Sequence, residues 1–138
     1  MNLELQTKTV LLVEDNEDDI FLMRRILKKA GIGVKLQVAT DGKMATQYLS
    51  AEGDFGDRER YPLPDLIFLD IKLPFLHGFE VLAWMRQRPK LSGMPVMILS
   101  SSLEDQDRER AKALGVPYLV KPPTVEMVNT ALRSIIVT

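Results

Sequence analysis

The sequence predicts an α/β fold, with a parallel β-sheet covered by helices on both faces. Short apolar runs rich in β-branched residues alternate with amphipathic helical patterns, giving five strand-then-helix units without an internal repeat. Parallel strands need crossover connections, and the helices supply them. The 138 residues, 46% hydrophobic and 27% charged, suit a single globular domain that needs no metal or disulfide staple to fold.

The first unit is a strand over Thr9–Val13 and a helix that ends at Ala30. The strand is apolar throughout, which is typical of a strand buried on both faces of a sheet. Asn16 is placed to cap the start of the helix, and Gly31 stands where a C-cap glycine ends one. The apolar stripe of this helix includes Ile20, Phe21, Ile26 and Leu27.

The second unit is an alternating strand over Val34–Thr40, a turn at Asp41 and Gly42, and a helix over Lys43–Ser50. A polar stretch with two Gly and two Pro follows at Ala51–Pro64, and we expect an irregular loop there. A linker to another domain is the alternative, although neither flank is long enough to be a full domain.

The last three units repeat the pattern. Their expected strands are Asp65–Asp70, Met94–Ser100 and Pro117–Val120. Their expected helices are Gly78–Gln87, Glu104–Leu114 and a final helix capped by Thr124 that runs to about Ile136. Pro89 and Gly115 follow the first two helices as stop signals.

Charge and composition exclude several classes of function. The 18 Lys and Arg against 19 Asp and Glu give a net charge of -1, so bulk electrostatic binding to nucleic acid or to an anionic membrane is not expected. The absence of cysteine excludes disulfides and thiolate chemistry, and the single histidine, His77, excludes multi-histidine metal sites. We expect His77 to be a surface residue. The N-terminus has no apolar signal region, which predicts a cytoplasmic protein.

Chemically active side chains follow four of the five predicted strands. Ligands of doubly wound sheets bind at the carboxyl ends of the strands. These ends carry Glu14 with Asp15, then Asp70, the run Ser100–Ser102, and Lys121. The sequence alone does not fix the strand order, but the order 2-1-3-4-5 would bring the three carboxylates together.

Three clustered carboxylates are unstable unless something neutralises them. Mg²⁺ is bound by one or two carboxylates together with water and phosphate oxygens, and a lysine can hold an anion beside it. A carboxylate in such a site can act as a nucleophile and become an aspartyl phosphate, with a hydroxyl such as that of Ser100 bonding a phosphoryl oxygen. Each of these features taken singly also fits solvated loop or turn residues. Their occurrence together, each at the carboxyl end of a strand, favours an active site.

These residues lie in four motifs that resemble the receiver domain of bacterial two-component response regulators. The motifs are LLVEDNEDD (11–19), PDLIFLDIKLPFLHG (64–78), PVMILSSS (95–102) and YLVKPP (118–123). They agree with the family in order and spacing over nearly the whole chain. The resemblance implies a flavodoxin-like (βα)₅ sandwich with strand order 2-1-3-4-5.

The resemblance also implies roles for individual residues. Asp70 would be the phosphoacceptor, and Asp15 and Asp70 would bind Mg²⁺ directly. Glu14 would act on the metal mainly through water, and the backbone carbonyl of Lys72 would be a further ligand. Beyond accepting and slowly losing its own phosphoryl group, the chain would not be an enzyme.

The remaining implied roles concern the response to phosphorylation. Ser100 would be the switch hydroxyl, Lys121 the phosphate-binding lysine before a cis bond to Pro122, and Tyr118 the aromatic switch. Ser101 replaces the smaller residue that is common at its position, which bears on the access of water to the acyl phosphate.

The long 51–64 loop, the SSS run and the KPP tripeptide resemble the phytochrome-associated, single-domain branch of the family. We therefore expect residues 1–138 to form one receiver domain without an output domain, unless the chain is an excised fragment. The expected partner is a sensor histidine kinase, with a phytochrome kinase as the candidate. Output would then proceed by protein contact or phosphate relay.

Three rival functions are less consistent with the motifs. A haloacid-dehalogenase-type phosphatase would carry a second Asp where Lys72 stands. A flavodoxin-type flavin carrier would not place the acidic EDNEDD loop (14–19) against an FMN phosphate. A pure interaction module would not need both Asp70 and Lys121.

The last helix carries more apolar residues than one buried stripe requires. This surplus predicts a homodimer through the face built from the fourth helix, the fifth strand and the fifth helix, although a wide, fully buried helix is the alternative. The apolar residues are Val125, Met127, Val128, Ala131, Leu132, Ile135 and Ile136.

Overall fold

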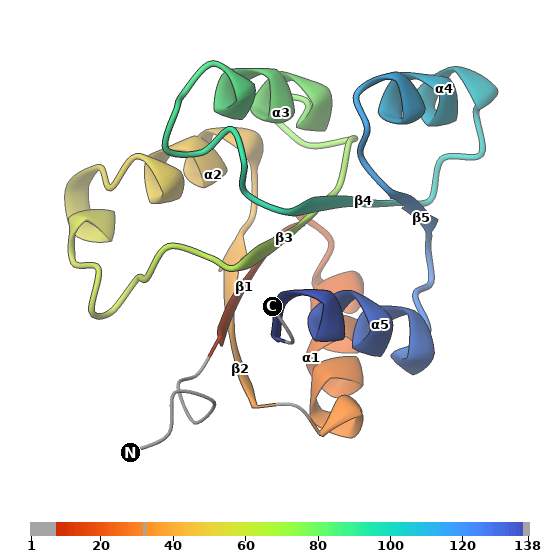
Figure 1. The fold of residues 1–138 in the computed structure, drawn as a ribbon, viewed down its shortest axis with the longest axis horizontal. Helices are drawn as coiled ribbons and strands as arrows, with labels where there is room; N and C mark the ends of the chain where they lie inside the picture. The colour runs from red at the N-terminus through yellow and green to blue at the C-terminus, as the bar shows by residue number, and fades with distance from the viewer. Residues whose placement is uncertain (1–7, 32, 137–138) are drawn as a thin grey trace.

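The computed structural model describes residues 8–31 and 33–136 and contains one five-stranded parallel sheet (Figure 1). The strands are β1 (Lys8–Val13), β2 (Val34–Ala39), β3 (Leu66–Leu69), β4 (Val96–Ser100) and β5 (Tyr118–Val120). The helices are α1 (Glu17–Ala30), α2 (Gly42–Leu49), α3 (Gly78–Arg86), α4 (Asp105–Ala113) and α5 (Val125–Ile136), with a short 3₁₀ helix η2 (Gly53–Gly56). The strand order is β2-β1-β3-β4-β5, which confirms the flavodoxin-like topology expected from the sequence.

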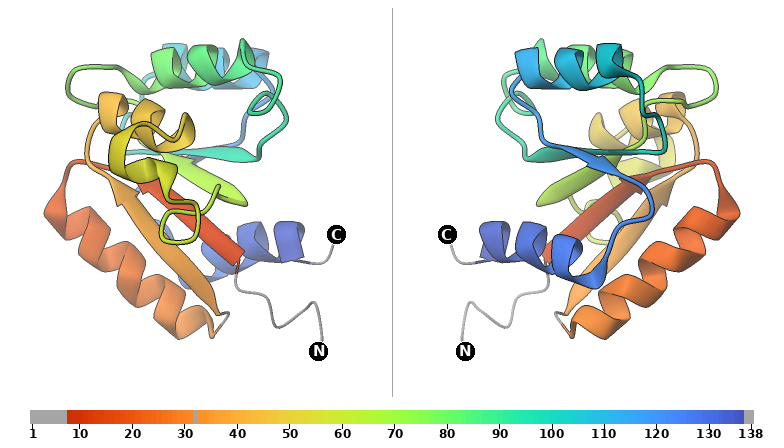
Figure 2. Two further views of the ribbon diagram at one scale, coloured as in Figure 1. Left: turned by 90° about the vertical axis from the view of Figure 1, so that its left-hand side faces the viewer. Right: turned by 90° about the vertical axis from the view of Figure 1, so that its right-hand side faces the viewer.

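The helices cover the sheet in two layers (Figure 2). α1 and α5 pack side by side on one face, while α2, α3 and α4 cover the other. Each face has its own apolar core, because strand residues point alternately to the two sides. Leu12 and Phe68 face α1 and α5, whereas Leu11 and Ile67 face the other three helices. Within the described ranges, no helix is long and apolar enough to cross a membrane.

All ten predicted strands and helices are present, and only their ends differ. β4 begins at Val96 and not at Met94, and β5 begins at Tyr118 and not at Pro117. Each of these strands starts directly after a proline, which has no N–H to donate to a ladder. The predicted caps of α1 are confirmed: Asn16 accepts a hydrogen bond from the Asp19 amide at 3.0 Å, and Gly31 adopts the left-handed φ of 70°.

The segment 51–64 departs from the irregular loop that was expected. It forms η2 and folds back on α2, where Tyr48, Phe55 and Tyr61 make a cluster with ring centroids 5.0–6.0 Å apart. The buried Tyr48 hydroxyl donates to the Pro62 carbonyl at 2.7 Å, and burial raises the pKa of this phenol to about 12. The phenol therefore keeps its proton, and this hydrogen bond, at neutral pH.

Arg58 closes the same segment onto the end of α2. Its guanidinium donates to the carbonyls of Tyr48, Leu49 and Tyr61 at 2.9, 3.0 and 3.1 Å. Two of these are carbonyls of the last turn of α2, which have no partner within the helix. No periodic pattern in the sequence predicts this cap.

Burial in the core accounts for only some of the apolar residues of α5. Val128, Ala131 and Leu132 are buried, whereas Val125 and Met127 are partly exposed. The side chains of Ile135 and Ile136 lie outside the described residues. Some of the apolar surplus on α5 is therefore available at the surface.

We predict that Arg58→Ala lowers the free energy of unfolding by about 2 kcal/mol, because three carbonyls lose a charged donor. Urea unfolding monitored by circular dichroism measures the loss. Lys43→Ala is the matched control, since Lys43 is an exposed cation on α2, the helix that Arg58 caps, and its removal should change stability by less than about 0.5 kcal/mol. Equal stability of the two variants would show that Arg58 does not hold the segment.

Candidate functional site

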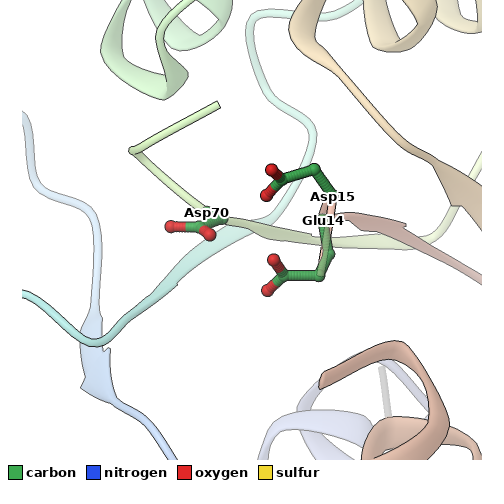
Figure 3. Close-up of side chains that lie close together, drawn as sticks. All are labelled: Glu14, Asp15 and Asp70. Carbon is green, nitrogen blue, oxygen red and sulfur yellow. The ribbon is translucent and has the colours of Figure 1, made fainter. Parts of the chain in front are cut away.

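The pairing of β1 with β3 brings two acidic residues together at the carboxyl edge of the sheet. Val13 and Leu69 are partners in the parallel ladder, and the next residues are Glu14 and Asp70. Carboxylate oxygens of Glu14, Asp15 and Asp70 all lie within 4.8 Å of one another (Figure 3). Glu14 and Asp70 are buried and Asp15 is exposed, so the cluster opens to solvent on the Asp15 side.

Lys121, the residue directly after β5, partly neutralises this cluster. Its Nζ atom forms ion pairs with Glu14, with Asp19 Oδ2 at 2.9 Å and with Asp70 Oδ2 at 3.2 Å. Asp19 was not singled out from the sequence. The signal was its place in the first turn of α1, three residues after the Asn16 cap, where acids are common for helix-dipole reasons alone.

The protonation of the cluster follows from burial and charge. Burial, and to a smaller extent the negative charge of Asp70, raise the pKa of the Glu14 carboxyl to about 7 against the opposing effect of Lys121. Burial alone would lower the pKa of Lys121, but hydrogen bonds to Glu14 and Asp19 and the charge of Asp70 raise it overall. Lys121 therefore remains a cation, and the acids together still exceed the positive charge beside them.

The loop after β3 folds back against Asp70 and Ile71. The Lys72 amide donates to Asp70 Oδ1 at 3.2 Å, and the Gly78 amide donates to the Ile71 carbonyl at 2.9 Å. A Cβ atom on Gly78 would lie 2.3 Å from the Asp70 carbonyl oxygen, which explains why a glycine starts α3 here. His77, expected to be a bland surface residue, is half-buried and caps α3, with Nδ1 accepting from the Phe79 amide at 3.2 Å.

The buried hydroxyl of Ser100 belongs to a chain of hydrogen bonds that reaches α4. Ser100 Oγ accepts from the Ser102 amide at 3.1 Å, and the Ser102 carbonyl accepts from the Tyr118 hydroxyl at 2.9 Å. Ser102 Oγ in turn donates to Asp107 Oδ2 at 2.7 Å. The sequence pointed to Ser100 and Tyr118, but the contribution of Ser102 and Asp107 depends on side-chain directions that spacing does not give.

The donor set suits a hard divalent cation. Carboxylate oxygens are preferred by Mg²⁺ and Mn²⁺, and three of them converge here with one open side. The residues present therefore fit a divalent metal held by Glu14, Asp15 and Asp70 beside Lys121.

The sequence profile of the response regulator receiver domain matches residues 10–133. The chain belongs to this family. A relative, the response regulator Rcp1 of Synechocystis sp., is 39% identical over 115 residues, covering 83% of this chain and 76% of that protein.

Solved receiver structures share the fold closely. The bacteriophytochrome response regulator RtBRR is 37% identical with a TM-score of 0.81, over 94% of this chain and 78% of that one. The phosphorylated cyanobacterial phytochrome response regulator RcpA is 33% identical with a TM-score of 0.79, over 94% and 91%. The Mn²⁺-bound form of Rcp1 is 35% identical with a TM-score of 0.76, over 93% and 91%.

Family membership settles the general function. The chain is a response regulator receiver of two-component phosphorelay signalling, in which a histidine kinase supplies the phosphoryl group. Its acidic pocket is the divalent-metal site of such domains. The phosphatase and flavin-carrier alternatives are thereby set aside.

Proposed function

We propose that Asp70 is the phosphoacceptor of this receiver. The main observation that supports this proposal is the position of Asp70. It is buried at the end of β3, with one carboxylate oxygen 3.2 Å from Lys121 Nζ. The other oxygen accepts from the Lys72 amide, which orients the carboxylate. In the transfer, an Asp70 oxygen bonds to phosphorus while the phosphorus–nitrogen bond of a phosphohistidine breaks, and the histidine leaves with the bonding electrons.

The neighbouring residues are proposed to stabilise the product. Lys121 would exchange its Asp70 contact for a phosphoryl oxygen, and the Ser100 hydroxyl would donate to another. Asp15, Asp70 and the Lys72 carbonyl would hold Mg²⁺ directly, with Glu14 acting through water. When bound, Mg²⁺ neutralises charge on the phosphoryl oxygens.

The phosphoryl transfer is proposed to be limited to the chain's own modification. A phosphatase with this nucleophile would need an acid or base near the leaving group, and Lys72 stands where that group would be. The chain would therefore acquire and slowly lose its own phosphoryl group without turning over free phosphate esters.

The kinase is proposed to dock at the carboxyl edge of the sheet. Three large apolar side chains are exposed on elements around this edge: Phe21 on α1, Phe75 after β3 and Leu103 after β4. Exposed apolar groups in such a pattern favour a protein partner. The phytochrome response regulators among the similar structures support a phytochrome kinase as this partner, and the two proteins would then meet in the cytoplasm.

Output is proposed to pass through protein contacts, including a homodimer through α4, β5 and α5. An apolar groove of about 390 Å³ lies on this face between β5 and α5. Leu119, Met127 and Ala131 are among its lining residues. The Ser100–Ser102–Tyr118 hydrogen bonds reach β5 from its α4 side, so phosphorylation would change the packing of the α4–β5 part of this face.

We predict one phosphoryl addition to the protein after incubation with acetyl phosphate and Mg²⁺, detected by intact mass. Asp70→Asn should abolish the addition, because it removes the nucleophilic carboxylate. The control Asp18→Asn, which changes an exposed acid of α1, should be labelled like the unmodified chain. Equal labelling of the Asp70 variant would exclude Asp70 as the phosphoacceptor.

We also predict that Asp15→Asn weakens Mg²⁺ binding more than Glu14→Gln does, by about tenfold. Asp15 is exposed and free of Lys121, whereas Glu14 is already engaged by that cation. Isothermal titration at constant pH measures both affinities. A larger loss in the Glu14 variant would reverse the assignment of direct and water-mediated ligands.

The dimer is tested by light scattering with and without beryllofluoride and Mg²⁺. We predict that activation increases the dimer fraction at tens of micromolar protein. Met127→Glu should suppress the increase, because it places a charge in the α5 groove. A monomer in both states would remove homodimerisation from the account and leave other partners for this face.

A further inference from the structure

A second groove lies at the amino edge of the sheet, opposite the carboxylate cluster. It has a volume of about 570 Å³ and lies between the end of α2, the 51–64 segment and the loop after α3. Each of these connections runs from a helix into a strand, so all of them lie at the amino edge. Leu49 and Leu91 are buried in its lining, and Leu63 is 44% exposed beside them.

The groove is apolar but positively charged. Its charged lining residues are Arg58, Arg88 and Lys90, and within the part of the chain that the structure describes no acidic residue lines it. Among the described residues, the three ion pairs all involve Lys121, so none of these cations is neutralised by a carboxylate. Arg58 is engaged by backbone carbonyls, which leaves the exposed Arg88 and Lys90 to meet a ligand.

The groove wall is held in place before any ligand arrives. Arg58 ties the 51–64 segment to α2 through the carbonyls of Tyr48 and Leu49, and the Tyr48 hydroxyl donates to the Pro62 carbonyl. A preformed wall reduces the entropy lost on binding. The volume is that of a pocket for one or two large side chains, and its concave form does not suit a flat membrane surface.

We propose that this groove binds an acidic peptide segment of a partner protein. A leucine- or phenylalanine-sized side chain would occupy the space beside Leu63 and Leu91, and flanking carboxylates would pair with Arg88 and Lys90. Apolar anchoring supplies affinity, and charge pairing selects acidic over basic segments. Because the groove is at the edge opposite Asp70, the partner can remain bound while a kinase reaches the phosphorylation site.

The chain carries its own reporter for this groove. Trp84 is the sole tryptophan, and the Arg88 guanidinium lies 4.1 Å from the centroid of its ring. Arg88 also donates to the Trp84 carbonyl at 3.1 Å. A carboxylate that draws Arg88 away from the ring should change tryptophan emission.

The test uses a fluorescein-labelled peptide with one central Phe flanked by four Glu, titrated with the full chain and followed by anisotropy. Matched peptides replace every Glu by Gln, every Glu by Lys, or Phe by Ala. We expect only the first peptide to bind at micromolar to sub-millimolar concentration, with a change in Trp84 emission. The Arg88→Gln, Lys90→Gln double variant should weaken binding by about tenfold.

The control is the Lys28→Gln, Lys29→Gln double variant, which removes the same charge from the exposed end of α1 and should change the affinity less than about twofold. Leu63→Ala tests the apolar part of the groove and should also weaken binding of the peptide. The proposal is overturned by absence of binding at about 1 mM, by equal binding of the Gln or Lys peptide, or by equal losses in the two double variants. Binding that shifts neither Trp84 emission nor the NMR signals of the Arg88, Lys90 and Leu91 amides would also overturn it.

Discussion

The ion pairs of Lys121 are the interaction on which the rest of this site depends. β5 borders neither β1 nor β3, yet the side chain of Lys121, the residue directly after β5, reaches past the end of β4 to contact Glu14, Asp19 and Asp70. Without this cation, buried carboxylates at the ends of two adjoining strands would repel one another and lose hydration without compensation. One lysine therefore permits the acidic cluster to exist in the folded chain, and it leaves enough unneutralised charge to attract a divalent cation.

The two edges of the sheet have different roles in the domain. At the carboxyl edge, the Lys121 amide donates to the Ser100 carbonyl, and Ser100 is hydrogen-bonded through Ser102 to Tyr118 and to Asp107 on α4. A change at Ser100 therefore has a hydrogen-bonded route to α4 and β5. At the amino edge, the 51–64 segment adds a rigid wall that is independent of this route. Chemistry and partner binding can thus occur at separate places on one small sheet.

The sequence predicted most of the fold because hydrophobic periodicity and helix caps are local signals. It also predicted that Glu14, Asp15, Asp70 and Lys121 converge, since each follows a strand and parallel strands end at one edge. What it missed depends on side-chain direction: Asp19 as a partner of Lys121, Asp107 as a partner of Ser102, and Arg58 as the cap of α2. These residues look like ordinary surface charges in the sequence, because no spacing rule distinguishes an exposed charge from one that turns inward.

The central claim, that Lys121 balances a carboxylate cluster built to receive a divalent cation, is tested most directly by the stability of Lys121→Met with and without Mg²⁺. The variant should lose about 3 kcal/mol of unfolding free energy at neutral pH in the absence of metal, because buried charges lose their partner. Saturating Mg²⁺ should reduce the difference in stability between the variant and the unmodified chain. The control Lys29→Met, which changes an exposed lysine in the last turn of α1, should behave like the unmodified chain in both conditions. A Lys121 variant that is as stable as the unmodified chain without metal, or a difference that Mg²⁺ leaves unchanged, would contradict the account.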